Sequence, residues 1–187
     1  MKPILTDDDY KRAAEAIGCD VAAIKAVCAV EAPHGGFLPS GQPTILFERH
    51  IFSRRTDGKF DKDYPGVSNP KPGGYVGGEF EHVRLQQAVT LDRTAALESA
   101  SWGKFQIMGF NWEACGADSL QDYINAMYDS ESAQLDTFVA FVKSQGLADE
   151  LRDGRWADFA RRYNGPNFAI NRYDQKLALA FNHATKA

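Results

Sequence analysis

Apolar residues at helical spacing predict a short first helix near the start of the chain. Thr6 and Asp9 stand three residues apart, which is the spacing of a capping box. The apolar positions that follow fall on one helix face until Gly18, a residue type that commonly ends helices. The pattern therefore predicts a helix between these two signals.

A second predicted helix carries an apolar face that ends in a carboxylate. Asp20 can cap this helix, and the positions i, i+3, i+4 and i+7 of one face are Ile24, Val27, Cys28 and Glu31. A proline and two glycines follow within five residues and stop the helix. Glu31 is therefore expected at the end of a buried helix face.

The middle of the chain changes character before helical patterns return. Residues 44–48 form a short β-prone stretch, and residues 57–78 are rich in glycine and proline, which predicts a loop-rich insert with room for a small hairpin. Helical periodicity then resumes at 79–92, 93–100, 119–145, 154–163 and 169–185. The predicted fold class is mainly α, a helical bundle with a small β element. No repeat or linker divides residues 1–187, so a single domain is expected.

Composition and charge exclude several function classes. The 187 residues are 44% hydrophobic and 25% charged, as in ordinary globular domains. The net charge of −4 lacks the positive footprint that duplex nucleic-acid binding needs, and no basic cluster predicts stable membrane association. The start of the chain is acidic where a signal peptide needs an apolar stretch, so we expect no signal peptide. Synthesis in a reducing cytosol is therefore expected.

Neither cysteines nor histidines predict a metal site. Cys19, Cys28 and Cys115 are odd in number and lack CxxC spacing, which favours free thiols. The four histidines contain no HExxH or other tight ligand pair, so no metal is expected. His34 and His50 could still line a cleft, because each follows a candidate glutamate closely in sequence.

Glu31 has the surroundings that suit a general acid. Burial against apolar groups raises the pKa of a carboxyl group, which then stays protonated and can donate to a leaving oxygen. The alternative is a glutamate at a helix end that reaches solvent or an arginine. The pattern around Glu31 alone does not decide between these interpretations.

Further motifs along the chain resemble those of a known family. Residues 101–108 read Ser-Trp-Gly-Lys-Phe-Gln-Ile-Met and residues 163–165 read Tyr-Asn-Gly. After a glutamate that ends a helix, this order resembles the lysozyme superfamily, particularly goose-type lysozymes and soluble lytic transglycosylases. With Val30-Glu31, Gly36-Phe37 and the Ile-Leu-Phe-Glu-Arg-His of residues 45–50, residues 20–183 resemble the N-acetylmuramidase domain of endolysins from bacteriophages of Gram-negative hosts.

The resemblance implies a fold, an activity and a place of action. It implies a lysozyme-like α+β fold with the insert beside a cleft, and a peptidoglycan hydrolase that cuts the β-1,4 bond between N-acetylmuramic acid and N-acetylglucosamine. Glu31 falls at the family's catalytic-glutamate position. No cofactor, no separate wall-binding module and a monomer acting on glycan strands are expected. Such an enzyme would be made in the host cytoplasm and reach the periplasmic cell wall after membrane permeabilisation.

A second carboxylate could activate water, and its distance from the acid would set the stereochemistry. Inverting glycosidases separate the two groups by about 6.5–9.5 Å and retaining ones by about 5–5.5 Å. Glu48 is the leading candidate because it follows the β-prone stretch, which lysozyme-like folds place across the cleft; a salt bridge to Arg49 or a helix-cap role is the alternative. Glu98 ranks below it. Glu131 is expected to be structural, with its charge paired to Arg161 or Arg162.

Substrate-binding roles are predicted for residues of the two later motifs. Gly103 allows the backbone to approach a ligand, and Ser101 and Gln106 belong to the same run, with Gln106 able to bond an N-acetyl group. Tyr163 and Asn164 could position a sugar or the acid. The alternative is that Tyr-Asn-Gly only ends a helix with a left-handed cap.

Two rival functions fit the same motifs. In a lytic transglycosylase the sugar's own 6-hydroxyl replaces water, anhydro-muramic ends form, and only one protein carboxylate is essential. A catalytically silent wall-binding or virion protein would keep the fold and bind glycan without releasing fragments.

Overall fold

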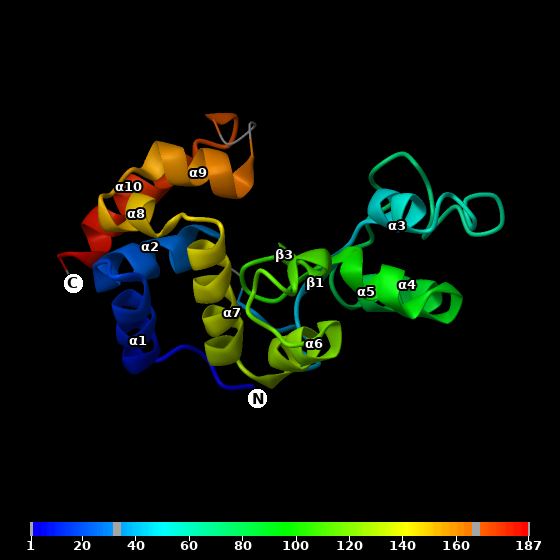
Figure 1. Cartoon of the computed structure of the whole chain (residues 1–187), viewed down its shortest axis with the longest axis horizontal. Helices are drawn as coiled ribbons and strands as arrows, with labels where there is room; N and C mark the ends of the chain where they lie inside the picture. The colour runs from blue at the N-terminus through cyan, green and yellow to red at the C-terminus, as the bar shows by residue number, and fades with distance from the viewer. Residues whose placement is uncertain (1, 32–34, 166–168, 187) are drawn as a thin grey trace.

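The computed structural model describes residues 2–31, 35–165 and 169–186. Helix α7 (Glu131–Ser144) stands in the middle of the molecule (Figure 1). Helices α1 (Asp7–Ile17) and α2 (Val21–Glu31) lie on one side of α7 together with the C-terminal helices, and α3 (Arg49–Arg55), α4 (Glu79–Leu91) and α5 (Arg93–Glu98) lie on the other. The predicted mainly α, lysozyme-like architecture with a small β element is confirmed.

The first two helices form as their local signals predict. Thr6 and Asp9 make a complete capping box at the start of α1, and Gly18 ends it with a φ of 79°. At the start of α2 the Asp20 carboxylate accepts from the Ala22 amide at 2.7 Å. The apolar face of α2 is buried and its last residue, Glu31, is half-buried, so the predicted carboxylate does close a buried face.

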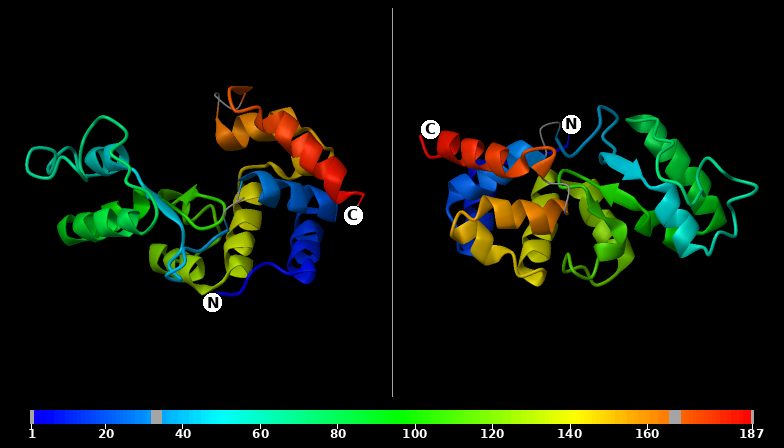
Figure 2. Two further views of the ribbon diagram at one scale, coloured as in Figure 1. Left: turned by 180° about the vertical axis from the view of Figure 1, so that it is seen from behind. Right: turned by 90° about the horizontal axis from the view of Figure 1, so that it is seen from above.

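A three-stranded antiparallel sheet lies between the two groups of helices (Figure 2). Its order is β1 (Ile45–Phe47), β2 (Ala100–Trp102) and β3 (Ile107–Met108). The prediction of β1 is confirmed. The helix predicted over 93–100 ends at Glu98, and β2 and β3 carry no signal in the sequence pattern. The turn between them, residues 103–106, contains two positive φ angles, 66° at Gly103 and 49° at Gln106.

The loop-rich insert at residues 57–78 is present, but the hairpin expected within it is wrong. Turns and bends fill this range, which contains no strand. Side chains order the insert from within, since Asp61 accepts from Ser68 at 2.5 Å and from Ser53 of α3 at 3.0 Å. The hairpin of the fold is β2–β3 instead.

Helix α4 differs from an ordinary amphipathic helix, because its buried face includes charged residues. Glu81 is fully buried and accepts from the amides of Phe47, Val76 and Gly77, as well as from Arg84 at 2.7 Å. Burial alone would raise the pKa of Glu81, but these backbone donors and the Arg84 charge lower it overall. Glu81 therefore joins β1 to the end of the insert.

The single long helix predicted over 119–145 is wrong, since two helices occupy this range. Ser130 adopts an extended conformation (φ −157°, ψ 162°) between α6 (Leu120–Asp129) and α7. Its hydroxyl accepts from the Ala133 amide at 3.1 Å, so it caps the second helix. Apolar periodicity continues across the break, which hid it from the sequence pattern.

The C-terminal part returns to the first helices. After η1 (Gly109–Asn111) and the α6–α7 pair, the short α8 (Ala148–Arg152) was not predicted, whereas α9 (Trp156–Asn164) and α10 (Tyr173–Ala184) were. Helix α10 packs along α2 and against α9. The core includes Ile24, Val27, Phe47, Phe52, Leu85, Trp102, Tyr123, Leu135, Phe138 and Phe159. No helix in the described ranges is long and apolar enough to cross a bilayer.

We predict that Glu81→Gln lowers the free energy of unfolding by about 3 kcal/mol or more, because Arg84 would be left buried without its counter-charge. Glu79→Gln, on the same first turn but exposed, is the control. Because the pKa of Glu81 is lowered in the folded state, its contribution is present near neutrality and is lost as the pH falls below the usual glutamate range of about 4.3. Urea unfolding at pH 7 and at pH 2.5, well below the usual glutamate pKa, measures both effects; equal midpoints for the two variants at pH 7 would contradict the prediction.

Candidate active site

Glu31 lines a cavity of about 340 Å³ whose walls come from several elements. Its volume lies within the range of about 300–1,000 Å³ found for small-ligand sites. Helix α2 supplies Glu31, the β2–β3 hairpin supplies one wall, and η1, α7, α9 and α10 supply the rest. The other lining residues are Phe105, Gln106, Ile107, Met108, Asn111, Phe141, Tyr163 and Tyr173.

Two tyrosines lie close enough to Glu31 to feel its charge. Burial raises the pKa of Tyr163 well above its usual value, and the negative charge of Glu31 raises it further. The pKa of Tyr173 is raised by the same two causes in the same order. Tyr163 donates its hydroxyl proton to the Phe105 carbonyl at 3.1 Å, which joins α9 to the hairpin turn.

The Ser-x-Gly-x-x-Gln motif forms a closed set of hydrogen bonds at the cavity edge. Ser101 donates to the Gln106 side-chain oxygen at 2.8 Å, and the Gln106 amide donates to the carbonyls of Gly103 at 2.8 Å and Thr44 at 3.2 Å. Gln106 thus lines the cavity while its side chain holds the turn together. The structure brings it near Glu31, and its role toward substrate stays a prediction.

Gly103 meets a packing requirement that the sequence did not indicate. A Cβ atom at this position would lie 2.7 Å from the side-chain carbon Cδ of Gln134, in addition to adopting an unfavourable positive φ. Gln134 belongs to α7 and is buried. The close approach at Gly103 is therefore to α7, and Gly103 does not line the Glu31 cavity.

The Tyr-Asn-Gly segment ends a helix, as its simpler interpretation predicts. Helix α9 ends at Asn164, and Gly165 follows with a φ of 79°. Tyr163 nevertheless lines the cavity, so both interpretations hold for this residue. The Asn164 side chain and His34 lie outside the part of the chain that the structure describes, and their predicted roles stay predictions.

Glu48 lies at the end of β1, outside the lining of the Glu31 cavity. It is the N-cap residue of α3 without making a side-chain cap bond. Its Oε2 accepts from the Tyr75 hydroxyl at 2.8 Å and lies 3.2 Å from the His50 Nδ1, within ion-pair distance although not aligned for a hydrogen bond. The expected alternative partner, Arg49, instead donates to carbonyls of the insert.

Comparison with known proteins identifies the family. The N-acetylmuramidase family model matches residues 20–185. The chain belongs to the N-acetylmuramidase family. Among solved structures, a Burkholderia AP3 phage endolysin is similar, with a TM-score of 0.93 and 44% sequence identity over 98% of this chain and 73% of that one. No curated protein matches.

The predicted enzyme class is thereby confirmed: this muramidase is a peptidoglycan-degrading glycoside hydrolase. The family substrate, peptidoglycan, matches the expected partner. The geometry around each candidate carboxylate bears on which of them takes part in the reaction.

The two remaining candidate carboxylates are engaged elsewhere in the muramidase. Glu98 ends α5 and forms an ion pair with Arg55, with the Nε donating at 2.7 Å. Glu131 is 5% exposed, and its Oε1 lies 3.3 Å from the Lys104 Nζ. The expected pairing of Glu131 with Arg161 or Arg162 is wrong, because Arg161 pairs with Asp158 and Arg162 pairs with Glu150.

Several cavity residues carried no sequence motif. Asn111, Phe141 and Tyr173 line the cavity from η1, α7 and α10, which meet only in the folded chain. Tyr173 is the first residue of α10. The helix predicted over 169–185 starts four residues too early. Among the residues that the structure describes, no three His, Cys, Asp or Glu side chains converge as a metal site would require.

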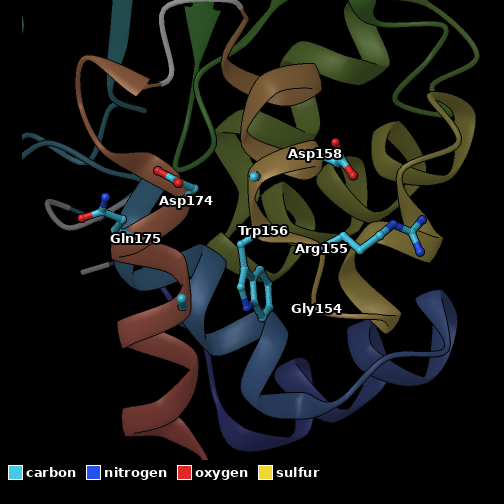
Figure 3. Close-up of a pocket in the computed structure, with 8 residues that line it drawn as sticks. Gly154, Arg155, Trp156, Asp158, Asp174 and Gln175 are labelled. Carbon is cyan, nitrogen blue, oxygen red and sulfur yellow. The ribbon is translucent and has the colours of Figure 1, made fainter.

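A second hollow, of about 440 Å³, lies between α9 and α10 and does not resemble a catalytic site (Figure 3). Arg155 and Asp158 extend away from Asp174 and Gln175 across it, so its charged groups do not converge. Arg155 is paired with aspartates near α8, and Trp156 packs on Phe181 with ring centroids 5.2 Å apart. None of the predicted site residues lines this hollow.

We predict that Tyr163→Phe lowers activity about tenfold, because Tyr163 itself lines the cavity beside Glu31 and its hydroxyl holds it in place. A loss of about 1.4 kcal/mol in positioning corresponds to a tenfold lower rate. Tyr123→Phe is a matched control, since the Tyr123 hydroxyl also donates to a carbonyl of the hairpin, that of Ile107 at 2.9 Å, from outside the cavity. Both variants should lose about 1 kcal/mol of stability. Peptidoglycan turbidity assays and thermal unfolding measure the two effects; equal activity in the two variants would contradict the assignment.

Proposed function

We propose that this muramidase hydrolyses the β-1,4 bond between N-acetylmuramic acid and N-acetylglucosamine, with Glu31 as the general acid. The observation that carries the proposal is the position of Glu31, at the end of a buried helix face and at the edge of a cavity of about 340 Å³. Glycosidic cleavage needs a protonated acid beside the leaving oxygen. Glu31 is the only carboxylate among the described residues that line this cavity.

We infer that the apolar part of the cavity wall favours the protonated form of Glu31. Phe105, Ile107, Met108 and Phe141 are apolar, and a carboxylate beside such groups loses hydration, which raises its pKa. The neighbouring Tyr163 keeps its proton at any physiological pH, so it adds no second negative charge near the acid. A protonated Glu31 can then transfer its proton to the glycosidic oxygen as the bond to the anomeric carbon breaks.

Polar groups around the cavity could orient an N-acetylated sugar. Gln106, Asn111 and Tyr173 offer amide and hydroxyl groups to the acetamido and hydroxyl substituents. Ser101 contributes through its bond to Gln106 and Gly103 through the shape of the turn. Asn164 belongs to the same proposed binding set on the grounds of its motif.

Glu48 is proposed as the second carboxylate. It directly follows β1, a strand of the sheet whose β2–β3 hairpin lines the cavity, and Tyr75 donates a hydrogen bond to its Oε2. In this role it would stabilise the oxocarbenium-like centre or accept a proton from the attacking water. The hydrogen bond from Tyr75 would orient the carboxylate for either task, and His50 lies within ion-pair distance of it.

The presence of a single carboxylate in the described lining of the cavity favours a second candidate reaction. A lytic transglycosylase needs one acid, because the 6-hydroxyl of muramic acid attacks in place of water. The two reactions leave different chain ends, a reducing muramic end or an anhydro-muramic end.

The similarity to a phage endolysin supports a proposal about the biological setting. We infer that the chain acts as a single catalytic domain and as a monomer on glycan strands, and that it reaches the wall of a Gram-negative host after the membrane is permeabilised. The reaction requires neither metal nor cofactor. A binding-only role as a wall or virion protein would instead leave the glycan uncut.

The first experiment digests purified Gram-negative peptidoglycan with the wild type and with Glu31→Gln. We expect muropeptides with reducing muramic ends from the wild type and a loss of about 10²–10⁴-fold in rate for the variant, as for removal of a general acid. Mass spectrometry with reducing-end labelling identifies the ends. Anhydro ends would establish the transglycosylase instead, and unaltered activity of Glu31→Gln would overturn the assignment of the acid.

Glu48→Gln tests the second carboxylate against Glu98→Gln, a control whose carboxylate is also half-buried and paired with a basic side chain. If Glu48 takes part in hydrolysis, we expect its variant to lose about 10²-fold or more in rate while Glu98→Gln keeps its activity. Release of reducing ends from soluble glycan strands provides the rate. Full activity of Glu48→Gln would remove this residue from the mechanism.

A further inference from the structure

We propose that Glu131 and Gln134, one turn apart on α7, are positioning residues for Glu31. They hold two segments near it: the backbone at Gly36, and the turn of the β2–β3 hairpin at residues 103–106. This inference rests on the proposed role of Glu31. The Glu131 Oε1 accepts from the Gly36 amide, five residues after Glu31, at 2.7 Å. The same oxygen lies 3.3 Å from the Lys104 Nζ in the hairpin turn. One buried carboxylate thus contacts both segments.

Gln134 makes the same connection with its neutral side chain. Its Oε1 accepts from the Lys104 amide at 2.7 Å, and its Nε2 donates to the carbonyls of Met127 at 2.8 Å and Gly36 at 3.4 Å. Gln134 is 1% exposed. Because water cannot reach its amide group, these protein hydrogen bonds take the place of hydrogen bonds to water. An amide has both donors and acceptors, which lets one side chain join two backbones.

The backbone comes so close to Gln134 at Gly36 and Gly103 that a larger residue at either position would displace the Gln134 side chain. A Cβ atom on Gly36 would overlap the Gln134 side-chain oxygen, and one on Gly103 would lie 2.7 Å from its Cδ. Contacts this close arise where packing has fixed the backbone against the side chain. Gly36 and Gly103 are thereby part of the same arrangement.

The two segments are also bonded to each other through Thr44, just before β1. The Thr44 amide donates to the Gly36 carbonyl at 2.9 Å, and the Gly103 amide donates to the Thr44 carbonyl at 2.7 Å. Gln106 donates to the same Thr44 carbonyl at 3.2 Å. A shift at Gln134 would therefore pass to Gln106 and to the cavity wall beside Glu31.

A polar arrangement at this point has a consequence that simple apolar packing lacks. Burying the Glu131 charge costs solvation free energy, and several directional bonds compensate for it only in one geometry. Catalysis in turn requires the acid and the sugar-binding wall in a fixed relation, and displacements of about 1 Å can cost about 10²-fold in rate. Glu131 and Gln134 would supply that fixed relation without touching substrate.

Gln134→Met tests the proposal, because methionine has a similar length but cannot make these hydrogen bonds. We expect kcat/KM on soluble glycan strands to fall about ten- to a hundredfold in protein that remains folded at the assay temperature. Gln134→Glu keeps the acceptor for the Lys104 amide and should recover part of the loss. Circular dichroism at the assay temperature gives the folded fraction.

Asp9→Asn is the control for a merely structural effect. Asp9 is also a buried carboxylate that contacts α7, through Ser132, but its partners Thr6, Arg12 and Ser132 lie outside both segments. We expect a lower unfolding temperature with kcat/KM unchanged in the folded fraction. Wild-type kcat/KM in folded Gln134→Met, or an equal loss in Asp9→Asn, would overturn the proposal.

If Gln134→Met does not fold, the pair of Lys104 and Glu131 decides. Lys104→Met leaves the Glu131 charge without its cation, and adding Glu131→Gln removes that charge while keeping an acceptor for the Gly36 amide. We expect kcat/KM to fall in Lys104→Met and to recover in the double variant, a coupling that independent sites do not show. Additive losses, or no loss, would contradict the positioning role. An inactive Glu31→Gln alongside such a result would leave the proposed function intact.

Discussion

The site depends on two buried polar side chains of one helix turn. Glu131 and Gln134 bind Gly36, five residues after Glu31, and Lys104 in the turn of the β2–β3 hairpin, whose residues Phe105 and Gln106 line the cavity beside Glu31. Helix α7 lies between the two groups of helices, so its first turn is where the parts of the molecule meet. The buried charge of Glu131 is tolerated because Lys104 and backbone amides compensate for it.

The same device recurs on the other side of the sheet. Glu81 of α4 accepts from backbone amides of β1 and of the insert and pairs with Arg84, which in turn donates to the Phe47 carbonyl at 3.0 Å. The insert is thereby fixed beside β1, and its Tyr75 reaches Glu48. A buried glutamate therefore binds the backbone near each of the two proposed catalytic carboxylates. Glu131 binds Gly36, five residues after Glu31, and Glu81 binds Phe47, the residue before Glu48.

Local signals were enough to predict α1, α2 and β1, because capping residues and short-range spacing act within a few residues. They failed where a local choice competes with a continuing pattern. Ser130 interrupts a helix although apolar residues keep helical spacing across it, and β2 and β3 are too short to show alternation. For the site, Glu31, Gln106 and Tyr163 were predicted and share the cavity, whereas Asn111, Phe141 and Tyr173 reach it from distant elements. The pairing of Glu131 with Lys104 spans 27 residues between different elements, so spacing could not reveal it.

We propose that Glu31 is an acid kept protonated by the apolar side chains that form part of its cavity wall. A ¹³C NMR titration of the side-chain carboxyl groups, with the Glu31 resonance assigned by its absence in Glu31→Gln, measures this directly. We expect a Glu31 pKa clearly above the ordinary glutamate value of about 4.3. A pKa at or below that value would contradict it, because Glu31 would then be ionised at neutral pH and could not protonate the leaving oxygen.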